Sequence, residues 1–296
     1  MKIYIYFLYF VFCSYSLYPQ ANLLNARVPQ DVGQLNEKQI ESNDEDPLPY
    51  GFIDDRDVLW SKTVWELIDL DERINFPYYY PTDTLNLGPD RRSLFHILKN
   101  NLRNGNIKEV YDDDYFQIKL TYREILDKLV SIDTLDAGFE QLNAGEALDP
   151  QYVNRRNITA REIRQYRVKG TWYFNKRQGE LKYRLLGLSP VAPDVYTLDK
   201  PEAEQDLVEL FWIWFPDARE SLNTSTVFNT RNSSQPITYD HMLNSRRFNS
   251  IIYKEENVYE DRLINEYIFE DALQQLLESE RIKNVIRDFE QDMWNN

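Results

Sequence analysis

The chain has 296 residues, a formal net charge of −15 and an isoelectric point near 4.7. This length allows one large domain or two modest ones, and 42% hydrophobic residues is typical of a chain that folds around a core. The net negative charge argues against a general nucleic-acid binder, because neutralising phosphates requires a basic surface. No nucleic acid is therefore expected as a partner.

Residues 1–21 have the features of an export signal. Lys2 is followed by an apolar run that is too short for a comfortable membrane span. We expect cleavage near Ala21, and a retained membrane anchor is the alternative. The single cysteine, Cys13, lies in this segment behind Phe12, where a lipoprotein signal would have a small residue. The mature chain should therefore form no disulfide.

Residues 22–57 are predicted to form an acidic extended arm. Asp44, Glu45 and Asp46 precede two prolines, and few large apolar residues occur before Tyr50. Such an arm either wraps a neighbouring subunit or remains a solvated tether.

The next stretch, residues 58–81, reads VLWSKTVWELIDLDERINFPYYYP. Its first half is predicted to be a helix, because a capping box occurs at Thr63–Glu66 and apolar residues recur at helical spacing at Trp60, Val64, Leu67 and Ile68. Its second half is predicted to be a stiff extended ribbon, because Pro77 and Pro81 fix φ and restrict the residues before them.

The aromatic residues of this stretch are candidate partner-binding residues, since rigid aromatic side chains are favoured anchors in protein interfaces. They are Trp60, Trp65, Tyr78, Tyr79 and Tyr80. Helical spacing favours a core position for the two tryptophans. For the tyrosines between the prolines, a partner-facing or groove-lining position is favoured.

The same stretch resembles the signature of the GldN/PorN family, periplasmic proteins of gliding motility and type IX secretion in Bacteroidota. The resemblance implies a non-catalytic structural subunit of a periplasmic ring, associated with the inner face of the outer membrane. It further implies binding to a GldK/PorK-like outer-membrane lipoprotein and a GldM/PorM-like periplasmic motor component, and self-association in the ring. It implies no catalytic residue and no cofactor.

Residues 58–150 are predicted to be mainly helical. A helix capped by Asp90 is expected over RRSLFHILKNNLRNG, ending at Gly105. Residues 115–122 are a strand or the beginning of a helix that covers 122–132. A loop is expected over 133–150.

Residues 151–252 are predicted to be an α+β part with a small antiparallel sheet packed with helices. A hairpin is expected over 165–189, and a strand over 207–216 with Leu210, Trp212 and Trp214 on one face. An edge strand near 224–230 and a short helix over 240–248 follow. The segment carries a basic band, in which Arg155, Arg156, Arg161 and Arg164 are further partner-binding candidates.

Residues 253–296 are predicted to form a long acidic C-terminal helix, which lies on the core or extends to a neighbour. The complete chain is thus assigned to the α+β class. The basic band and the acidic helix suit head-to-tail association of copies. The alternative is that both charged segments are solvated or fold onto the chain itself.

Sequence motifs give little support for catalysis or metal binding. His96 and His241 are far apart, and no nucleophile or phosphate-binding motif occurs. Asp112–Asp114 lacks the spacing of a calcium loop and is better explained as a turn. Thr84 and Thr134 lie in short motifs that resemble O-glycosylation sites of Bacteroidota.

Two other functions are alternatives to the assembly role. A periplasmic glycan-binding protein would need its exposed aromatic residues in one open cleft, lined by Trp172, Trp212 and Trp214. A hydrolase would need two carboxylates that face each other in a pocket.

Overall fold

The computed structural model describes residues 47–83, 91–145, 147, 149–229, 237–269 and 271–294, without the side chains of Ala203 and Trp294. Residues 47–296 form one compact unit. Residues 47–57, the last part of the predicted arm, therefore belong to this unit, whereas the predicted signal and the rest of the arm lie outside the described residues. Within the described part of the chain, no helix is both long and apolar enough to cross a membrane.

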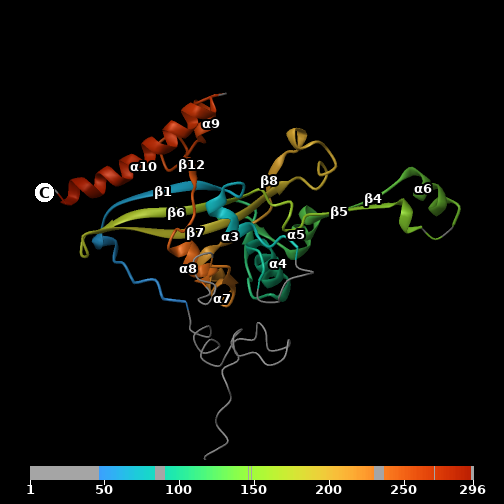
Figure 1. Cartoon of the computed structure of the whole chain (residues 1–296), viewed down its shortest axis with the longest axis horizontal. Helices are drawn as coiled ribbons and strands as arrows, with labels where there is room; N and C mark the ends of the chain where they lie inside the picture. The colour runs from blue at the N-terminus through green and yellow to red at the C-terminus, as the bar shows by residue number, and fades with distance from the viewer. Residues whose placement is uncertain are drawn as a thin grey trace, which may run out of the picture. The chain divides into compact units, whose positions relative to one another are not determined.

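An antiparallel eight-stranded sheet forms the centre of the unit, in the order β12-β1-β6-β7-β9-β2-β3, with β8 paired to β7. Figure 1 labels β1, β6, β7, β8 and β12 of this sheet. Its strands are β1 (Val58–Asp69), β2 (Val110–Tyr111), β3 (Lys119–Leu120), β6 (Gln165–Asn175), β7 (Glu180–Pro193), β8 (Leu207–Glu209), β9 (Trp212–Trp214) and β12 (Ile251–Glu255). Helices pack against this sheet, which confirms the α+β class. The hairpin predicted over 165–189 is formed by β6 and β7.

Strand β1 replaces the helix that was predicted over the same residues, so that prediction was wrong. The strand is paired on both edges, with β6 from Trp60 to Asp69 and with β12 from Val64 to Leu67. A central strand that is buried on both faces carries apolar residues without alternation. Such a run also contains residues at helical spacing, and this is why the pattern misled.

The tyrosine run also differs from its prediction. Residues Phe76–Tyr79 form the short helix α3, with Pro77 in its first turn, and only Tyr80 is extended. Proline is well tolerated at the start of a helix, because the missing N–H would have no helical acceptor there. The expected ribbon was therefore wrong for residues 77–79.

One face of the sheet carries most of the helices. Its residues include Ile68, Tyr166, Val168 and Leu188, which join the main hydrophobic cluster. The helices that contribute to this cluster are α3, α4 (Leu94–Asn104), α5 (Tyr122–Leu129), α7 (Phe215–Asn223) and α8 (Tyr239–Asn244). Helix α4 ends at Gly105 as predicted, with φ of 75°. Its N-cap is Ser93, and Asp90 lies outside the described residues.

The opposite face carries a smaller aromatic cluster, in which Trp65, Tyr111 and Trp212 are buried. The prediction that Leu210 shares the face of Trp212 was wrong. The chain leaves the strand at Leu210 and Phe211, between β8 and β9, and both side chains enter the main cluster on the helical side.

The remaining elements lie outside the central sheet. Strands β4 (Val130–Thr134) and β5 (Val153–Asn157) pair with each other, and α6 (Asp136–Asn143) lies between them where a loop was expected. Strands β10 (Thr226–Val227) and β11 (Ile237–Thr238) form a second small pair. The short 3-10 helices are η2 (Asp55–Asp57), η3 (Arg73–Asn75), η4 (Pro150–Tyr152) and η5 (Glu202–Glu204).

The C-terminal segment forms two helices instead of one, α9 (Ile264–Tyr267) and α10 (Ala272–Trp294). In α10, Ile282 and Ile286 are buried with Val64 of β1 and Ile252 of β12. Farther along the helix, the ring of Phe289 stacks on Trp60 at 4.7 Å. The second half of α10 therefore lies on the core.

Candidate partner-binding site

Three of the candidate aromatic anchors are structural. Trp65 and Tyr78 are each 1% exposed, and Trp60 is half-buried beneath Phe289. The Tyr78 hydroxyl donates a hydrogen bond to the carbonyl oxygen of Arg247 at 3.3 Å. A partner could reach Trp65 or Tyr78 only after unfolding, so neither can act as a surface anchor.

Trp65 forms one wall of a closed cage for two lysines. The ammonium groups of Lys169 and Lys254 lie 4.6 and 4.2 Å from the centre of its ring, and 4.5 and 4.6 Å from the ring of Tyr115. Asp114 supplies the counter-charge, with its carboxylate 2.7 Å from Lys254 and its carbonyl oxygen 2.9 Å from Lys169. Burial lowers the pKa of Lys169. The cage therefore places Lys169, which belongs to the basic band, inside the fold.

The acidic triplet Asp112–Asp114 has a structural explanation at each position. Besides Asp114 in the cage, Asp112 pairs with Lys128 at 2.5 Å. Asp113 accepts hydrogen bonds from the backbone N–H groups of Tyr115, Gln117 and Ile118. Within the described ranges, no group of three or more His, Cys, Asp or Glu residues is placed to hold a metal ion. The triplet shapes the turn that covers the aromatic face of the sheet.

Four other candidates come together at the surface, although about eighty residues separate them in the chain. Tyr79 packs edge-on against Tyr80 at 4.8 Å, and Tyr80 packs edge-on against Phe76 at 5.5 Å. The Tyr79 hydroxyl donates to the carbonyl oxygen of Arg161 at 3.0 Å. We call Phe76, Tyr79, Tyr80, Arg161 and Arg164 the aromatic–arginine patch.

The charged and titratable groups of the patch are only partly shielded from solvent. Desolvation raises the pKa of Tyr79, and the neighbouring Tyr80 adds to this. Arg164 forms an ion pair with Glu202 at 3.0 Å. The Arg161 side chain is exposed and forms no ion pair with any residue in the described part of the chain. Arg161 is therefore the cation of the patch that is available to a partner.

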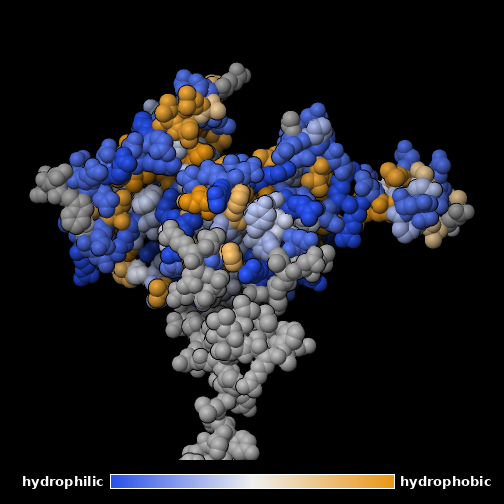
Figure 2. All heavy atoms as spheres, viewed as in Figure 1, coloured by the Kyte–Doolittle hydropathy of each residue, from blue (hydrophilic) through white to orange (hydrophobic). Residues whose placement is uncertain are grey.

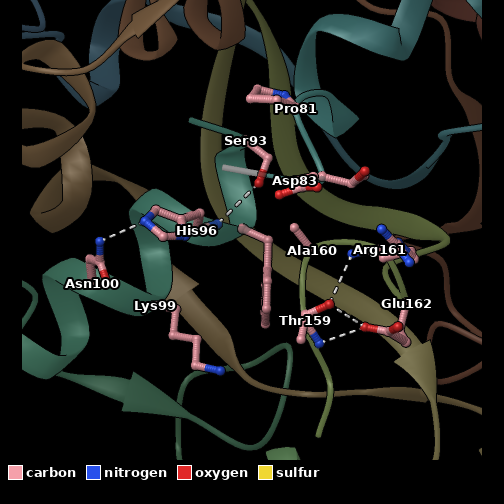
Figure 3. Close-up of a pocket in the computed structure, with 12 residues that line it drawn as sticks. Pro81, Asp83, Ser93, His96, Lys99, Asn100, Thr159, Ala160, Arg161 and Glu162 are labelled. Atoms are coloured by element: carbon pink, nitrogen blue, oxygen red, sulfur yellow. Dashed lines mark hydrogen bonds between the residues drawn. The ribbon is translucent and has the colours of Figure 1, made fainter. Parts of the chain in front are cut away.

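A polar pocket of about 490 Å³ adjoins the patch at Arg161 (Figure 3). It lies between the start of α4 and the segment before β6, and its lining residues are Pro81, Thr82, Asp83, Ser93, Phe95, His96, Lys99, Asn100, Thr159, Ala160, Arg161 and Glu162. Burial, Arg92 and Lys99 lower the pKa of His96. Its Nε2 atom lies 2.9 Å from Nδ2 of Asn100.

The pocket is lined by two carboxylates, those of Asp83 and Glu162. Figure 3 shows the Glu162 carboxylate turned toward Thr159, whose N–H and hydroxyl donate to it at 2.7 and 2.5 Å. Glu162 is thus held within its own loop.

A profile of the family described as "Gliding motility associated protein GldN" matches residues 53–295. The chain belongs to the GldN family. No curated protein matches it. The match begins just before β1 and includes the sheet, the cage, the patch and α10, so these features all lie within the family's domain. This GldN-family chain is therefore related to gliding motility.

The last two candidate residues of the GldN-family chain lie apart from the patch, on β5. Arg156 forms ion pairs with Asp199 at 2.5 Å and Asp133 at 3.9 Å. Arg155 is exposed and donates to Asn157 at 3.3 Å. Other members of the basic band also have internal partners: Arg167 with Glu209, Arg177 with Asp57, and Arg184 with the carbonyl oxygen of Gly51. The band does not form one continuous basic face.

The three tryptophans that a glycan cleft would need lie on different faces of the sheet. Trp172 packs in the cluster with Val64, beneath α10, whereas Trp212 and Trp214 belong to the aromatic cluster on the opposite face. Side chains on opposite faces of one sheet cannot line a common cleft. The arrangement required for glycan binding is therefore not present among these residues.

Sequence reasoning missed Phe76, His96 and Lys99 as neighbours of the site. Phe76 could have been included, because it directly precedes Pro77 and the tyrosine run. His96 and Lys99 are one helical turn apart on α4, but nothing in the sequence places them next to Arg161.

Proposed function

We propose that this GldN-family protein is a non-catalytic structural subunit of the periplasmic ring of the type IX secretion and gliding machinery. In this proposal it is exported and associates with the inner face of the outer membrane. It binds a GldK/PorK-like lipoprotein and the periplasmic part of a GldM/PorM-like motor component, and it associates with further copies of itself. Family membership and the aromatic–arginine patch support the proposal.

The patch has the properties of a preformed protein-binding surface. Tyr80, which directly follows the short helix α3, is 51% exposed, while Tyr78 within α3 is buried and fixes the position of the helix. The hydrogen bond from Tyr79 to Arg161 fixes the second ring. Rigid aromatic side chains lose little conformational entropy on binding, and tyrosine and arginine are enriched among the residues that dominate the energetics of interfaces. We assign the patch to the lipoprotein partner.

A pull-down of the tagged full-length chain from a native envelope tests this assignment. We expect the wild-type chain to recover a lipoprotein in near-stoichiometric amount. Replacing the central ring (Tyr80→Ala) together with the free cation (Arg161→Glu) should lower the recovery at least tenfold, since a well-packed anchor contributes about 2 kcal/mol or more. Tyr259→Ala is the matched control, because Tyr259 is an exposed tyrosine outside the patch.

Two results would count against the proposed function. One is recovery of the wild-type chain as a soluble monomer, without a lipoprotein, from membranes that were not stripped with detergent. The other is equal recovery of the lipoprotein by the patch variant and by Tyr259→Ala, which would move the binding surface elsewhere.

A further inference from the structure

The ammonium group of Lys99 lies beside the pocket without a counter-charge from the described part of the chain. Its side chain is half-buried, and no carboxylate of the described residues lies within ion-pair distance of it. It donates one long hydrogen bond, of 3.4 Å, to the carbonyl oxygen of Ile158. Burial lowers the pKa of Lys99 and the nearby Glu162 raises it, but burial has the larger effect. Lys99 is therefore a partly desolvated cation with hydrogen-bonding capacity left.

A desolvated cation of this kind costs free energy unless an anion or several hydrogen bonds replace its water. The lysine cage shows how the same chain meets this requirement. There the carboxylate of Asp114 lies 2.7 Å from Lys254, and its carbonyl oxygen lies 2.9 Å from Lys169. The described residues provide no such carboxylate for Lys99. The adjoining pocket of about 490 Å³ leaves room for one from another molecule.

Arg161 is the second cation of the pocket. It is exposed, and it forms no ion pair with a described residue. The Tyr79 hydroxyl fixes its backbone through the hydrogen bond of 3.0 Å. Because Arg161 lines the pocket and also belongs to the aromatic–arginine patch, a protein bound to the patch reaches the pocket as well.

The patch supplies apolar surface next to these two cations. Phe76 is 37% exposed and Tyr80 is 51% exposed. Figure 2 shows hydrophobic residues among hydrophilic ones on the surface over α3. A ligand that covers the patch and the pocket together must therefore carry an apolar group and a negative charge close to each other.

The two carboxylates of the pocket limit the charge of such a ligand. Glu162 already accepts two hydrogen bonds from Thr159, and Figure 3 shows Asp83 and Lys99 on opposite sides of the pocket. Electrostatic repulsion is proportional to charge, so these carboxylates repel a phosphate with nearly two negative charges about twice as strongly as a carboxylate with one. A single carboxylate is therefore the better match.

We propose that the pocket receives the carboxylate of an aspartate or glutamate side chain from the protein that binds the aromatic–arginine patch, with Lys99 and Arg161 as its ion-pair partners. This inference rests on the proposed function and specifies the chemistry of the partner. The partner segment carries an acidic residue for the pocket and, beside it, an apolar or aromatic residue that packs on Tyr80.

Carbodiimide cross-linking of the full-length chain, assembled with its lipoprotein, tests the contact directly. The reagent activates the carboxylate of the partner. The neutral amine of Lys99 then displaces the reagent as a urea and loses a proton, and the resulting amide joins the two proteins. The lowered pKa of Lys99 favours the neutral amine. Mass spectrometry should find Lys99 linked to an aspartate or glutamate of the lipoprotein.

Three variants of the full-length chain separate charge from amine chemistry. Lys99→Met keeps the aliphatic part of the side chain and should lower recovery of the lipoprotein at least tenfold. Lys99→Arg keeps the charge, so it should recover more lipoprotein than Lys99→Met, but it should give no cross-link at this position. Lys108→Met is the matched control, because Lys108 is an exposed lysine outside the pocket.

Urea unfolding distinguishes a binding role of Lys99 from a structural role. Lys99→Met removes a desolvated charge that has no counter-charge in the described chain, so its unfolding midpoint should equal or exceed that of the wild type. A lower midpoint would show that the chain itself satisfies the ammonium group, and it would overturn the proposed contact.

The remaining outcomes separate this inference from the proposed function. Equal recovery of the lipoprotein by Lys99→Met and Lys108→Met overturns the pocket contact and leaves the proposed function intact. A link from Lys99 to Glu162, with none to the lipoprotein, does the same, because the cation is then balanced within one chain. A wild-type chain that recovers no lipoprotein overturns both the proposed function and this contact.

Discussion

Replacing Arg246 by methionine should destabilise the fold by about 3–5 kcal/mol, the cost of removing one partner from a buried ion pair. Its partner, Glu66 on β1, is 1% exposed. The two guanidinium Nη atoms of Arg246 donate to the two carboxylate oxygens at 2.8 and 2.7 Å, and the Ser250 hydroxyl donates to the same carboxylate. Without Arg246, the serine hydroxyl would be the only one of these donors left to a buried negative charge.

The reverse variant and the double variant make the reasoning specific. Glu66→Met should destabilise the fold as well, because Arg246 would lose its counter-charge while its guanidinium still lies 4.1 Å from the ring of Tyr183. The double variant, Glu66→Met with Arg246→Met, should be less destabilised than either single variant, because it leaves neither charge buried.

Urea unfolding measures these free energies, and thermal unfolding gives an independent check. In a domain of this size, 1 kcal/mol corresponds to about 2–4 °C in Tm, so Arg246→Met should lower Tm by roughly 6–20 °C. A cost below about 1 kcal/mol would show that water reaches the carboxylate, and it would refute the argument from burial.

Three further predictions follow from single contacts. Phe289→Ala should destabilise the protein by about 1–2 kcal/mol and speed hydrogen exchange in the last turns of α10, because the stack on Trp60 is lost. The lowered pKa of His96 means that the unfolded chain binds a proton more readily, so the free energy of unfolding should fall as pH drops below about 6.5. His96→Gln should flatten this dependence in urea unfolding between about pH 7.5 and 5, and an unchanged slope would show that other groups cause it. Asp113→Ala should cost about 1–2 kcal/mol and expose residues 112–118 to limited proteolysis, while an uncut turn would show that it folds without this carboxylate.

Elements whose signals are local were predictable from the sequence. The β6–β7 hairpin has both strands and its turn in one continuous segment, and α4 has an apolar stripe followed by Gly105 as a stop. In these cases the residues that determine the structure are neighbours in the chain. No distant contact had to be known.

Strand β1 could not be predicted in the same way, because its partners lie far along the sequence. Trp60 pairs with Phe174, and Leu67 pairs with both Arg167 and Ile251. Strand β1 lies between these two partner strands, and both of its faces are buried. It therefore carries apolar residues on both faces, and the alternation of apolar and polar residues that is typical of a strand is lost. Tertiary contacts alone distinguish this run from a helix.

The sequence identifies the residue types of the candidate site, but not which of these side chains remain exposed. Exposure depends on whether the folded chain covers each side chain or neutralises its charge. The sequence draws attention to aromatic and basic residues, but the fold places side chains of these types in two different environments. Lys169 and Lys254 lie between Trp65 and Tyr115 with Asp114 as their counter-charge, so this cage is complete within one copy.

The aromatic–arginine patch contains the same kinds of side chain as the cage, but its side chains are not all covered or neutralised within one copy. Tyr80 is half exposed, and the ion pairs of the described residues leave Arg161 without a carboxylate. A cation next to aromatic rings attracts an acidic or aromatic group most strongly where no internal acid competes for it. The presence or absence of an internal counter-charge therefore separates the structural cluster from the candidate binding surface in this protein. Only the folded chain reveals that difference, because Asp114 lies far in sequence from the lysines that it neutralises.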